Sequence, residues 1–208
     1  MKLFNRVRKP KRETPHKIIE KTYKINELEA AFTKEKGKNS KLKEINAVRR
    51  KDSGKFVLGD IKDKFYHTHI LDSLKERNKL IPSPEDIVTS SLLKRYKNVK
   101  NNGVFLIHKG KEIGKIHFRL SDKFIKDIRE GTERASKTNK DINKVDFFNA
   151  FLKLRISNIY SFNILKDKMT LEKQVKIINE LKKEGIQIKY KAMPGYKFNE
   201  KTMLFEKA

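Results

Sequence analysis

The order of apolar and polar residues predicts strands in the first part of the chain. The segment 62–71, KDKFYHTHIL, is predicted to be one of them. Because neighbouring side chains of a strand point to opposite faces, Phe65, His67 and His69 are expected to share one face. Farther along, VFLIHKGKEIGKIHF at 104–118 predicts a hairpin that turns at its Lys-Gly-Lys. The two patterns together favour a sheet.

A helix is predicted over residues 84–97. Ser83 is suited to cap it, Pro84 fits the first helical position, and Asp86 stands where a capping box needs an acceptor. The apolar positions expected to face the core are Val88, Leu92 and Tyr96. A strand, a helix and a hairpin in this order are typical of an α/β or α+β domain.

The last third of the chain adds helical and strand patterns. Residues 170–185 predict an amphipathic helix that Thr170 caps and Gly185 ends. IQIKYKAM at 186–193 then alternates as a strand does. The segment 145–165, VDFFNAFLKLRISNIYSFNIL, is apolar nearly all round, so its periodicity leaves helix and strand open.

The charge of the chain bears on its partners. Lys and Arg number 51 against 26 Asp and Glu, which gives a formal net charge of +25. Such an excess favours nucleic acid or an acidic membrane face as a partner, unless AT-rich coding alone enriched the chain in lysine. Residues 1–15 are interpreted as a flexible basic arm, either bound along the phosphates of nucleic acid or merely solvated. The basic residues of this arm are Lys2, Arg6, Arg8, Lys9, Lys11 and Arg12.

The absence of cysteine limits the kinds of metal site and catalytic nucleophile that the chain can form. It excludes disulfides, thiolate metal sites and a cysteine nucleophile. Any zinc site must therefore use histidine and carboxylate ligands. No apolar run approaches the roughly 20 residues of a membrane span, and the first residues lack the core of a signal peptide. We expect no membrane span and a cytoplasmic or other intracellular, reducing location.

Two histidines and one carboxylate are candidate metal ligands. His67 and His69 lie two positions apart on the predicted strand, so both can reach one ion from the same face. Asp86, on the first turn of the next helix, completes a set of three ligands that leaves one zinc position for water. Ser83 is placed to donate a hydrogen bond to a developing oxyanion. The alternative is a strand and a capped helix that carry no chemistry.

The order of these residues resembles the JAMM (MPN-type) zinc metalloprotease family. That family has a His-x-His-Pro motif on a strand, then Ser-x-x-Asp on the following helix. This chain has HTH at 67–69 and SPED at 83–86. The resemblance implies a Zn2+-dependent hydrolase of peptide or isopeptide bonds, typically those of ubiquitin-like modifiers. It also implies that His67, His69 and Asp86 are the ligands and that Ser83 assists the oxyanion.

An upstream glutamate completes the motif of that family. In NELEAAF the resemblance implies Glu29 as the general base, with Glu27 as the second choice. Two differences from the family motif stand out. Ile70 replaces the proline, and 13 residues separate His69 from Ser83, which is several more than the family has.

The resemblance divides the chain into three parts. Residues 1–15 form the arm, residues 16–120 a JAMM-like metal-binding core with a mixed sheet flanked by helices, and residues 121–208 an α+β extension packed on that core. Two functions follow. The first is a zinc hydrolase that acts on a protein or a ubiquitin-like-modified substrate. The second is a basic nucleic-acid-binding, ribosome-associated or viral protein without enzymatic activity, built on its own fold or on an inactive JAMM-like scaffold.

Overall fold

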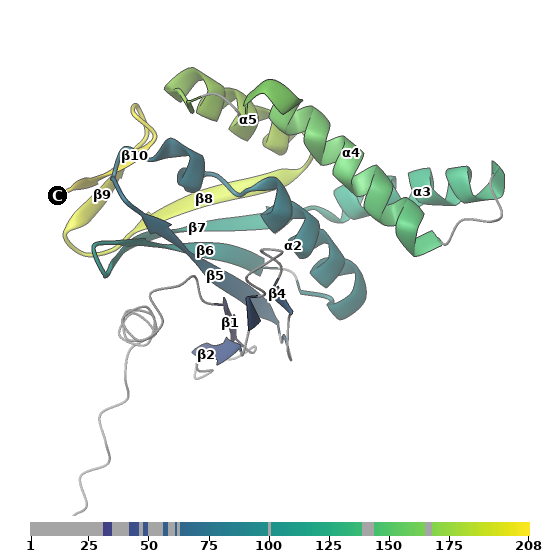
Figure 1. Cartoon of the computed structure of the whole chain (residues 1–208), viewed down its shortest axis with the longest axis horizontal. Helices are drawn as coiled ribbons and strands as arrows, with labels where there is room; N and C mark the ends of the chain where they lie inside the picture. The colour runs from purple at the N-terminus through teal and green to yellow at the C-terminus, as the bar shows by residue number, and fades with distance from the viewer. Residues whose placement is uncertain are drawn as a thin grey trace, which may run out of the picture.

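A mixed six-stranded sheet lies at the centre of the protein (Figure 1). The computed structural model describes residues 31–34, 42–45, 48–49, 56–57, 61, 63–99, 101–138, 144–164 and 168–208. The strand order is β2-β1-β5-β6-β7-β8, in which β5 and β6 run parallel and the other neighbours run antiparallel. These strands are β1 (Ala31–Lys34), β2 (Leu42–Ile45), β5 (Lys64–Leu71), β6 (Asn101–His108), β7 (Lys111–Leu120) and β8 (Ile186–Ala192).

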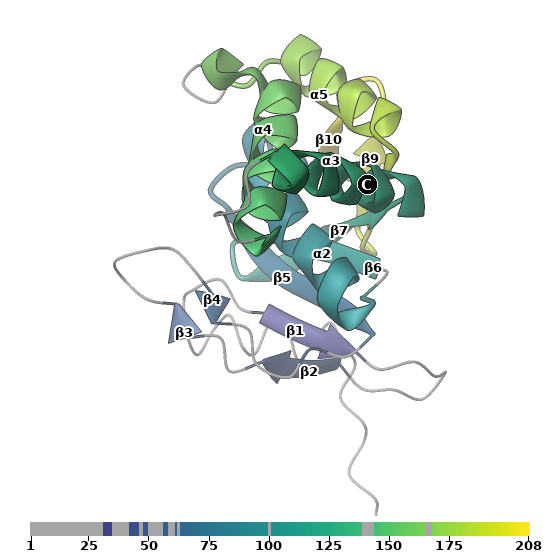
Figure 2. The same cartoon turned by 90° about the vertical axis from the view of Figure 1, so that its right-hand side faces the viewer.

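Helices cover one face of this sheet, as the two perpendicular views show (Figures 1 and 2). The helical elements are η1 (Arg77–Leu80), α2 (Pro84–Lys97), α3 (Asp122–Thr138), α4 (Lys144–Ile164) and α5 (Leu171–Lys183). One apolar core joins α2, α4 and α5 to the sheet, with Ile87, Leu152 and Ile177 packed in the same cluster as Val104 and Ile116. The expected mixed α/β class with flanking helices is confirmed.

Five of the segments predicted from the sequence have the expected structure. β5 covers the strand predicted at 62–71, α2 spans the predicted residues 84–97, and β6 and β7 form the hairpin. Helix α5 begins after its Thr170 cap and ends before Gly185, whose φ is +83°. In β8 the even-numbered side chains point into the core side and the odd-numbered ones are exposed. The segment whose pattern left helix and strand open is the helix α4.

The buried face of α2 agrees with the predicted one in part. Val88 and Leu92 pack against the core as expected. Tyr96 is instead 54% exposed, and Ile87, Ser91 and Leu93 are buried. Ser91 donates its hydroxyl to the carbonyl of Ile87 at 2.7 Å, so this polar side chain is satisfied within the helix. Ser91 was not predicted because serine is not expected in an apolar core.

Two short hairpin-like sheets complete the described strands. β3 (Val48–Arg49) pairs with β4 (Phe56–Val57), and β9 (Tyr196–Asn199) pairs with β10 (Leu204–Lys207). β9 and β10 form an antiparallel hairpin. Its Phe205 ring lies against Gly114 of β7, where an added Cβ would come within 2.2 Å of the ring. A glycine in β7 therefore allows the hairpin to close the end of the core.

The basic arm and both upstream glutamates lie outside the described residues. Within the described part of the chain, no helix combines the length and the apolar character that a membrane crossing requires.

Candidate metal centre

Strand β5 carries both candidate histidines on its helix-facing side. His67 and His69 are buried, with 6% and 9% of their surfaces exposed. His67 pairs with Ala31 of β1 on one side and with Val104 of β6 on the other, so it lies inside the sheet and not at an edge. Pairing on both sides fixes the backbone, and the two-residue period then places both imidazoles on one face, as predicted.

The start of helix α2 brings Asp86 to the same place. Ser83 caps the helix, Pro84 occupies the first position, and a complete capping box is present. The Asp86 backbone N–H donates to Ser83 Oγ at 3.1 Å, and the Ser83 backbone N–H donates to Asp86 Oδ2 at 2.7 Å. The capping box therefore fixes the rotamer of the carboxylate that faces the histidines.

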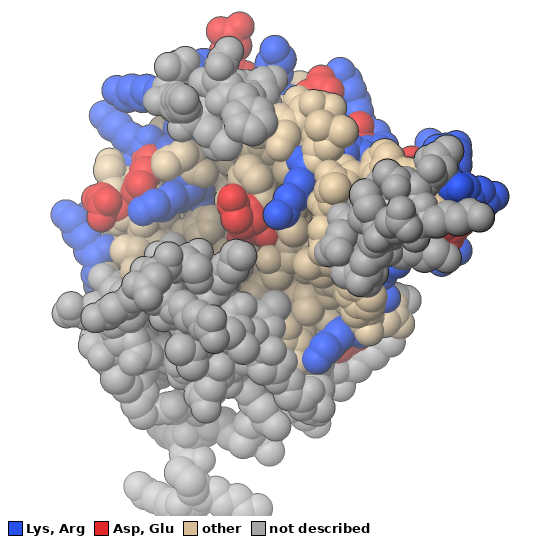
Figure 3. Space-filling view, turned by 45° about the vertical axis from the view of Figure 1, so that its right-hand side comes forward, with Lys and Arg blue, Asp and Glu red and all other residues tan. Residues whose placement is uncertain are grey.

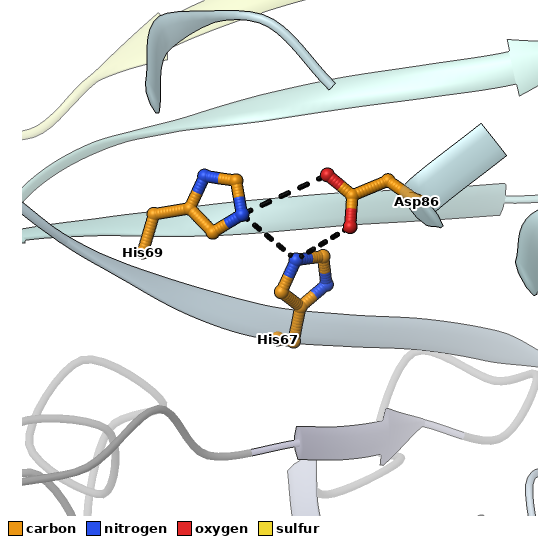
Figure 4. A group of neighbouring side chains, drawn as sticks. All are labelled: His67, His69 and Asp86. Atoms are coloured by element: carbon orange, nitrogen blue, oxygen red, sulfur yellow. Dashed lines mark hydrogen bonds and ion pairs between the residues drawn. The ribbon is translucent and has the colours of Figure 1, made fainter. Parts of the chain in front are cut away.

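The three side chains converge on one point (Figure 4). His67 Nε2 lies 3.1 Å from His69 Nε2 and 3.0 Å from Asp86 Oδ1. His69 Nε2 lies 3.7 Å from Asp86 Oδ2. The exposed fraction of each of these side chains is between 7% and 11%, so the cluster is largely shielded from solvent.

The electrostatics of the cluster favour an ionised carboxylate. Burial alone would raise the pKa of Asp86. Attraction to His67, a hydrogen bond from His67, attraction to His69 and the Ser83 N–H together outweigh burial and lower that pKa to about 2. Asp86 therefore carries its negative charge throughout the neutral range, as a carboxylate ligand must.

A backbone carbonyl orients one of the imidazoles. His69 Nδ1 lies 3.2 Å from the carbonyl of Lys79, which can only accept. The Nδ1 proton is therefore donated to that carbonyl, and the lone pair of the ring is left on Nε2, which faces Asp86. Metal-binding histidines are held in one tautomer by this kind of contact.

The long loop between β5 and α2 is tied to the C-terminal part of the chain. The Tyr190 hydroxyl on β8 donates to the carbonyl of Leu80 at 2.9 Å, and the Tyr160 hydroxyl on α4 donates to the carbonyl of Pro82. Arg77 Nη1 donates to Gln174 on α5 at 2.8 Å. These contacts hold the loop on both sides of Lys79, whose carbonyl orients His69, and up to the residue before the cap of α2.

These supporting residues were not predicted. A backbone carbonyl leaves no signal in a sequence. Tyr190 and Tyr160 lie in segments whose pattern is mainly apolar. Their hydroxyl groups could have identified them, because a buried tyrosine needs a hydrogen-bond acceptor. Burial raises the pKa of both phenols, so both remain proton donors at neutral pH.

The arrangement fits a zinc ion by its donor set and its spacing. Two imidazole nitrogens and one carboxylate oxygen form the ligand set of many catalytic zinc sites. With zinc–ligand bonds of about 2.0–2.1 Å and tetrahedral angles, neighbouring ligand atoms are separated by about 3.3–3.4 Å. The two Nε2 atoms are 3.1 Å apart, close to that value, and taking one ligand atom from each residue all three lie within 4.8 Å of one another. Among the described residues, this cluster is the group of histidine and carboxylate side chains with metal-ligand geometry.

The remaining candidate residues from the sequence differ in where the structure places them. Glu29 and Glu27 lie outside the described residues, so their role as base stays a prediction. Ser83 is at the site, where its Oγ accepts the helix N–H and its hydroxyl proton can still be donated. His108 Nδ1 lies 3.0 Å from the carbonyl of Leu71, and His117 lies against Tyr66 on the opposite face of the sheet, so neither belongs to the cluster.

No protein-family model matches the chain, and no curated protein or solved structure is detectably similar to it.

Proposed function

We propose that this protein is a zinc-dependent hydrolase in which His67, His69 and Asp86 hold the metal. The observation that carries the proposal is the convergence of two Nε2 atoms and one carboxylate within 3.0 to 3.7 Å of one another, from a strand and a helix start that are both fixed by backbone hydrogen bonds. Zinc in such a set acts as a Lewis acid and lowers the pKa of a water towards neutrality.

Other residues of the site would hold the ligands in place and transfer protons. Asp86 supplies the negative charge, and its carboxylate is held in place by the Ser83 N–H at 2.7 Å. Lys79 fixes the tautomer of His69 through its carbonyl. The Ser83 hydroxyl is placed beside the ligands, where its proton can be donated to an oxyanion. A hydrolase also needs a proton acceptor. Glu29 is proposed for that role, because it precedes by two residues Ala31, which pairs with His67.

The proposed substrate is a peptide or isopeptide bond of a protein or a ubiquitin-like-modified protein. This part of the proposal rests on the resemblance to the JAMM family, whose motif has two histidines on a strand and then a serine and an aspartate on the next helix, although Ile70 replaces the proline of that motif. The chain also has a long insert between the two halves of the motif. Support for a working site despite the insert comes from the anchoring of that loop by Tyr160, Tyr190 and Arg77.

The competing function for the same residues is a scaffold without a metal. In that case His67 and Asp86 form a buried ion pair that stabilises the fold and does nothing else. The two functions differ in their response to metal. A structural ion pair is disrupted by neither chelator nor zinc, whereas a hydrolytic site loses activity with chelator and regains it with zinc.

Hydrolysis is tested with the full chain on fluorogenic peptides and on a substrate joined through a lysine isopeptide bond. The expected result is zinc-dependent turnover that a chelator stops reversibly. Asp86→Asn should abolish it, because the charged ligand is lost, while His108→Gln serves as the matched histidine control outside the cluster. Glu29→Gln should stop turnover and leave zinc bound, since it removes a proton acceptor and not a ligand.

If Glu27→Gln stops turnover and Glu29→Gln does not, the base is Glu27. Turnover that persists in Asp86→Asn, or that a chelator leaves unchanged, contradicts the proposal.

A further inference from the structure

The sheet face opposite the helices carries a ladder of basic side chains. Strands β7 and β8 pair so that Lys115 lies opposite Lys191 and His117 lies opposite Lys189. One step farther along the ladder, Arg119 lies opposite Gln187. Arg119, Lys189 and Lys191 are exposed. Directly opposite like charges destabilise an antiparallel pair, so this arrangement costs folding free energy in the isolated protein.

Further lysines extend the basic surface across the sheet. Burial lowers the pKa of Lys115, Glu112 raises it, and the positive charges of Lys191, Lys34 and Lys64 lower it again. Lys34 is on β1 and Lys64 is on β5, and each shares its face with the ladder. Lys115 also lies 5.7 Å from the Phe105 ring, which steadies its ammonium group over an aromatic face.

The pKa of His117 is lowered in part by the same positive charges. Burial lowers its pKa first, and the charges of Lys115, Lys191 and Lys64 lower it further, to about 4. The imidazole is therefore neutral at physiological pH, and lysines and an arginine supply the charge of the surface.

We infer that this β7–β8 basic face, formed by Lys115, Arg119, Lys189 and Lys191, binds the phosphate backbone of nucleic acid. A phosphate chain offsets the repulsion between the cross-strand cations and releases its own counterions on binding. The contacts involve charge and no base-reading motif, so sequence specificity is expected to be low. This inference is independent of the proposed hydrolase function.

An acidic membrane face is the other polyanion that a basic surface could meet. Binding in a membrane interface also requires apolar side chains that insert among the lipids. The exposed large apolar side chains of the described residues are Tyr96, Leu154, Leu171 and Val175. All of them are on α2, α4 and α5, on the other side of the sheet. The basic face has charge without an apolar partner, which favours nucleic acid.

The charge pattern differs elsewhere on the surface. In the view of Figure 3, blue Lys and Arg side chains are interspersed with red Asp and Glu side chains. On the helices this mixing includes ion pairs such as Arg129 with Glu133 and Lys183 with Glu180. The β7–β8 basic face is therefore a more concentrated source of one sign of charge than the mixed helical surface.

The test measures binding of a fluorescent single-stranded RNA, a single-stranded DNA and phosphatidylserine vesicles to the full chain as salt is raised. The variant Arg119→Gln/Lys189→Gln/Lys191→Gln removes three exposed charges from the face. The matched control Lys153→Gln/Lys176→Gln/Lys182→Gln removes three exposed lysines from α4 and α5 and gives the same net charge. Thermal unfolding of both variants verifies that they fold.

The expected result is that the face variant binds about tenfold more weakly or worse near 0.1 M salt. Its slope of log affinity against log salt should become less negative by about 2, because each of the three lost phosphate contacts contributes roughly −0.7 for a single strand. The control should keep most of the affinity and the slope. Equal losses in both variants would show that only overall charge matters and would overturn the inference. Absence of binding by the wild type, or binding confined to phosphatidylserine vesicles, would also overturn it.

Discussion

The backbone N–H of Ser83 donates a hydrogen bond of 2.7 Å to Asp86 Oδ2, while the other oxygen of that carboxylate lies 3.0 Å from His67 Nε2. One carboxylate therefore serves both the start of helix α2 and the candidate metal centre. The link has a physical consequence. A capping box restricts Asp86 to one rotamer, so the ligand is pre-organised by the same hydrogen bonds that begin the helix.

Substitutions of Ser83 separate the cap from the chemistry. Ser83→Ala removes the acceptor of the Asp86 N–H and should lower the free energy of unfolding by about 0.5–2 kcal/mol. It keeps the backbone N–H that holds Asp86, so zinc should remain bound. If the hydroxyl also donates to an oxyanion, turnover should fall roughly a hundredfold or more. Urea unfolding, zinc content and turnover are measured on the same preparation.

Ser83→Asp supplies the control for that experiment. Aspartate caps helices well, so the stability lost in Ser83→Ala should return. It carries no proton to donate at neutral pH, so turnover should stay low. Recovery of full turnover with aspartate would leave Ser83 with a capping role alone.

The tyrosines that hold the loop before α2 are expected to affect metal affinity from a distance. Tyr190→Phe removes the donor to the carbonyl of Leu80 and should cost about 1–3 kcal/mol of stability, since a buried carbonyl loses its partner. Loss of that anchor should also weaken zinc binding by about tenfold or more, because the loop positions both Lys79 and Ser83. Calorimetric zinc titration measures the effect.

Tyr96→Phe is the matched control, because Tyr96 is 54% exposed on α2. It should leave both quantities unchanged. Zinc affinity that is equal in Tyr190→Phe and the wild type would show that the loop anchor is purely structural.

Stability should fall as the pH is lowered through the titration range of His117. Its pKa is about 4 in the folded protein against 6.5 for the ordinary side chain. Between those pH values the unfolded chain binds a proton that the folded protein does not bind, so the unfolded state gains relative stability as pH decreases. After discounting for partial exposure, the loss amounts to about 1–2 kcal/mol.

The measurement compares urea midpoints at pH 7 and near pH 4.5 for the wild type and for His117→Gln. The variant should lose less stability than the wild type over this range, because glutamine does not titrate. Identical losses in the two proteins would mean that His117 is protonated equally in the folded and unfolded states.

Local signals in the sequence were sufficient for the elements that build the site. A strand was predicted at the position of β5, and a serine, proline and aspartate in the right order located the start of α2. Both features depend on local backbone geometry, so they can be recognised in the sequence without knowledge of the fold. The convergence of His67, His69 and Asp86 followed from them once the strand and the helix were adjacent.

Features that depend on distant packing were not predictable in this way. Tyr190 is 110 residues from Leu80, whose carbonyl it holds, and no periodicity connects them. The buried face of α2 was predicted only in part. Val88 and Leu92 pack against the core, but Tyr96 is exposed, because packing against α4, whose helical form the sequence left open, helps determine which side of α2 is covered. The pairing of β7 with β8, which creates the basic face, likewise joins segments separated by the three helices α3, α4 and α5.

Zinc binding by the purified full chain tests the central claim most directly. The wild type should bind about one zinc per chain, measured by elemental analysis after exhaustive dialysis and by calorimetric titration. His67→Ala/His69→Ala should bind none, and His108→Ala/His117→Ala, which removes two histidines outside the cluster, should still bind one. Substoichiometric zinc in the wild type that does not change in His67→Ala/His69→Ala would contradict the account.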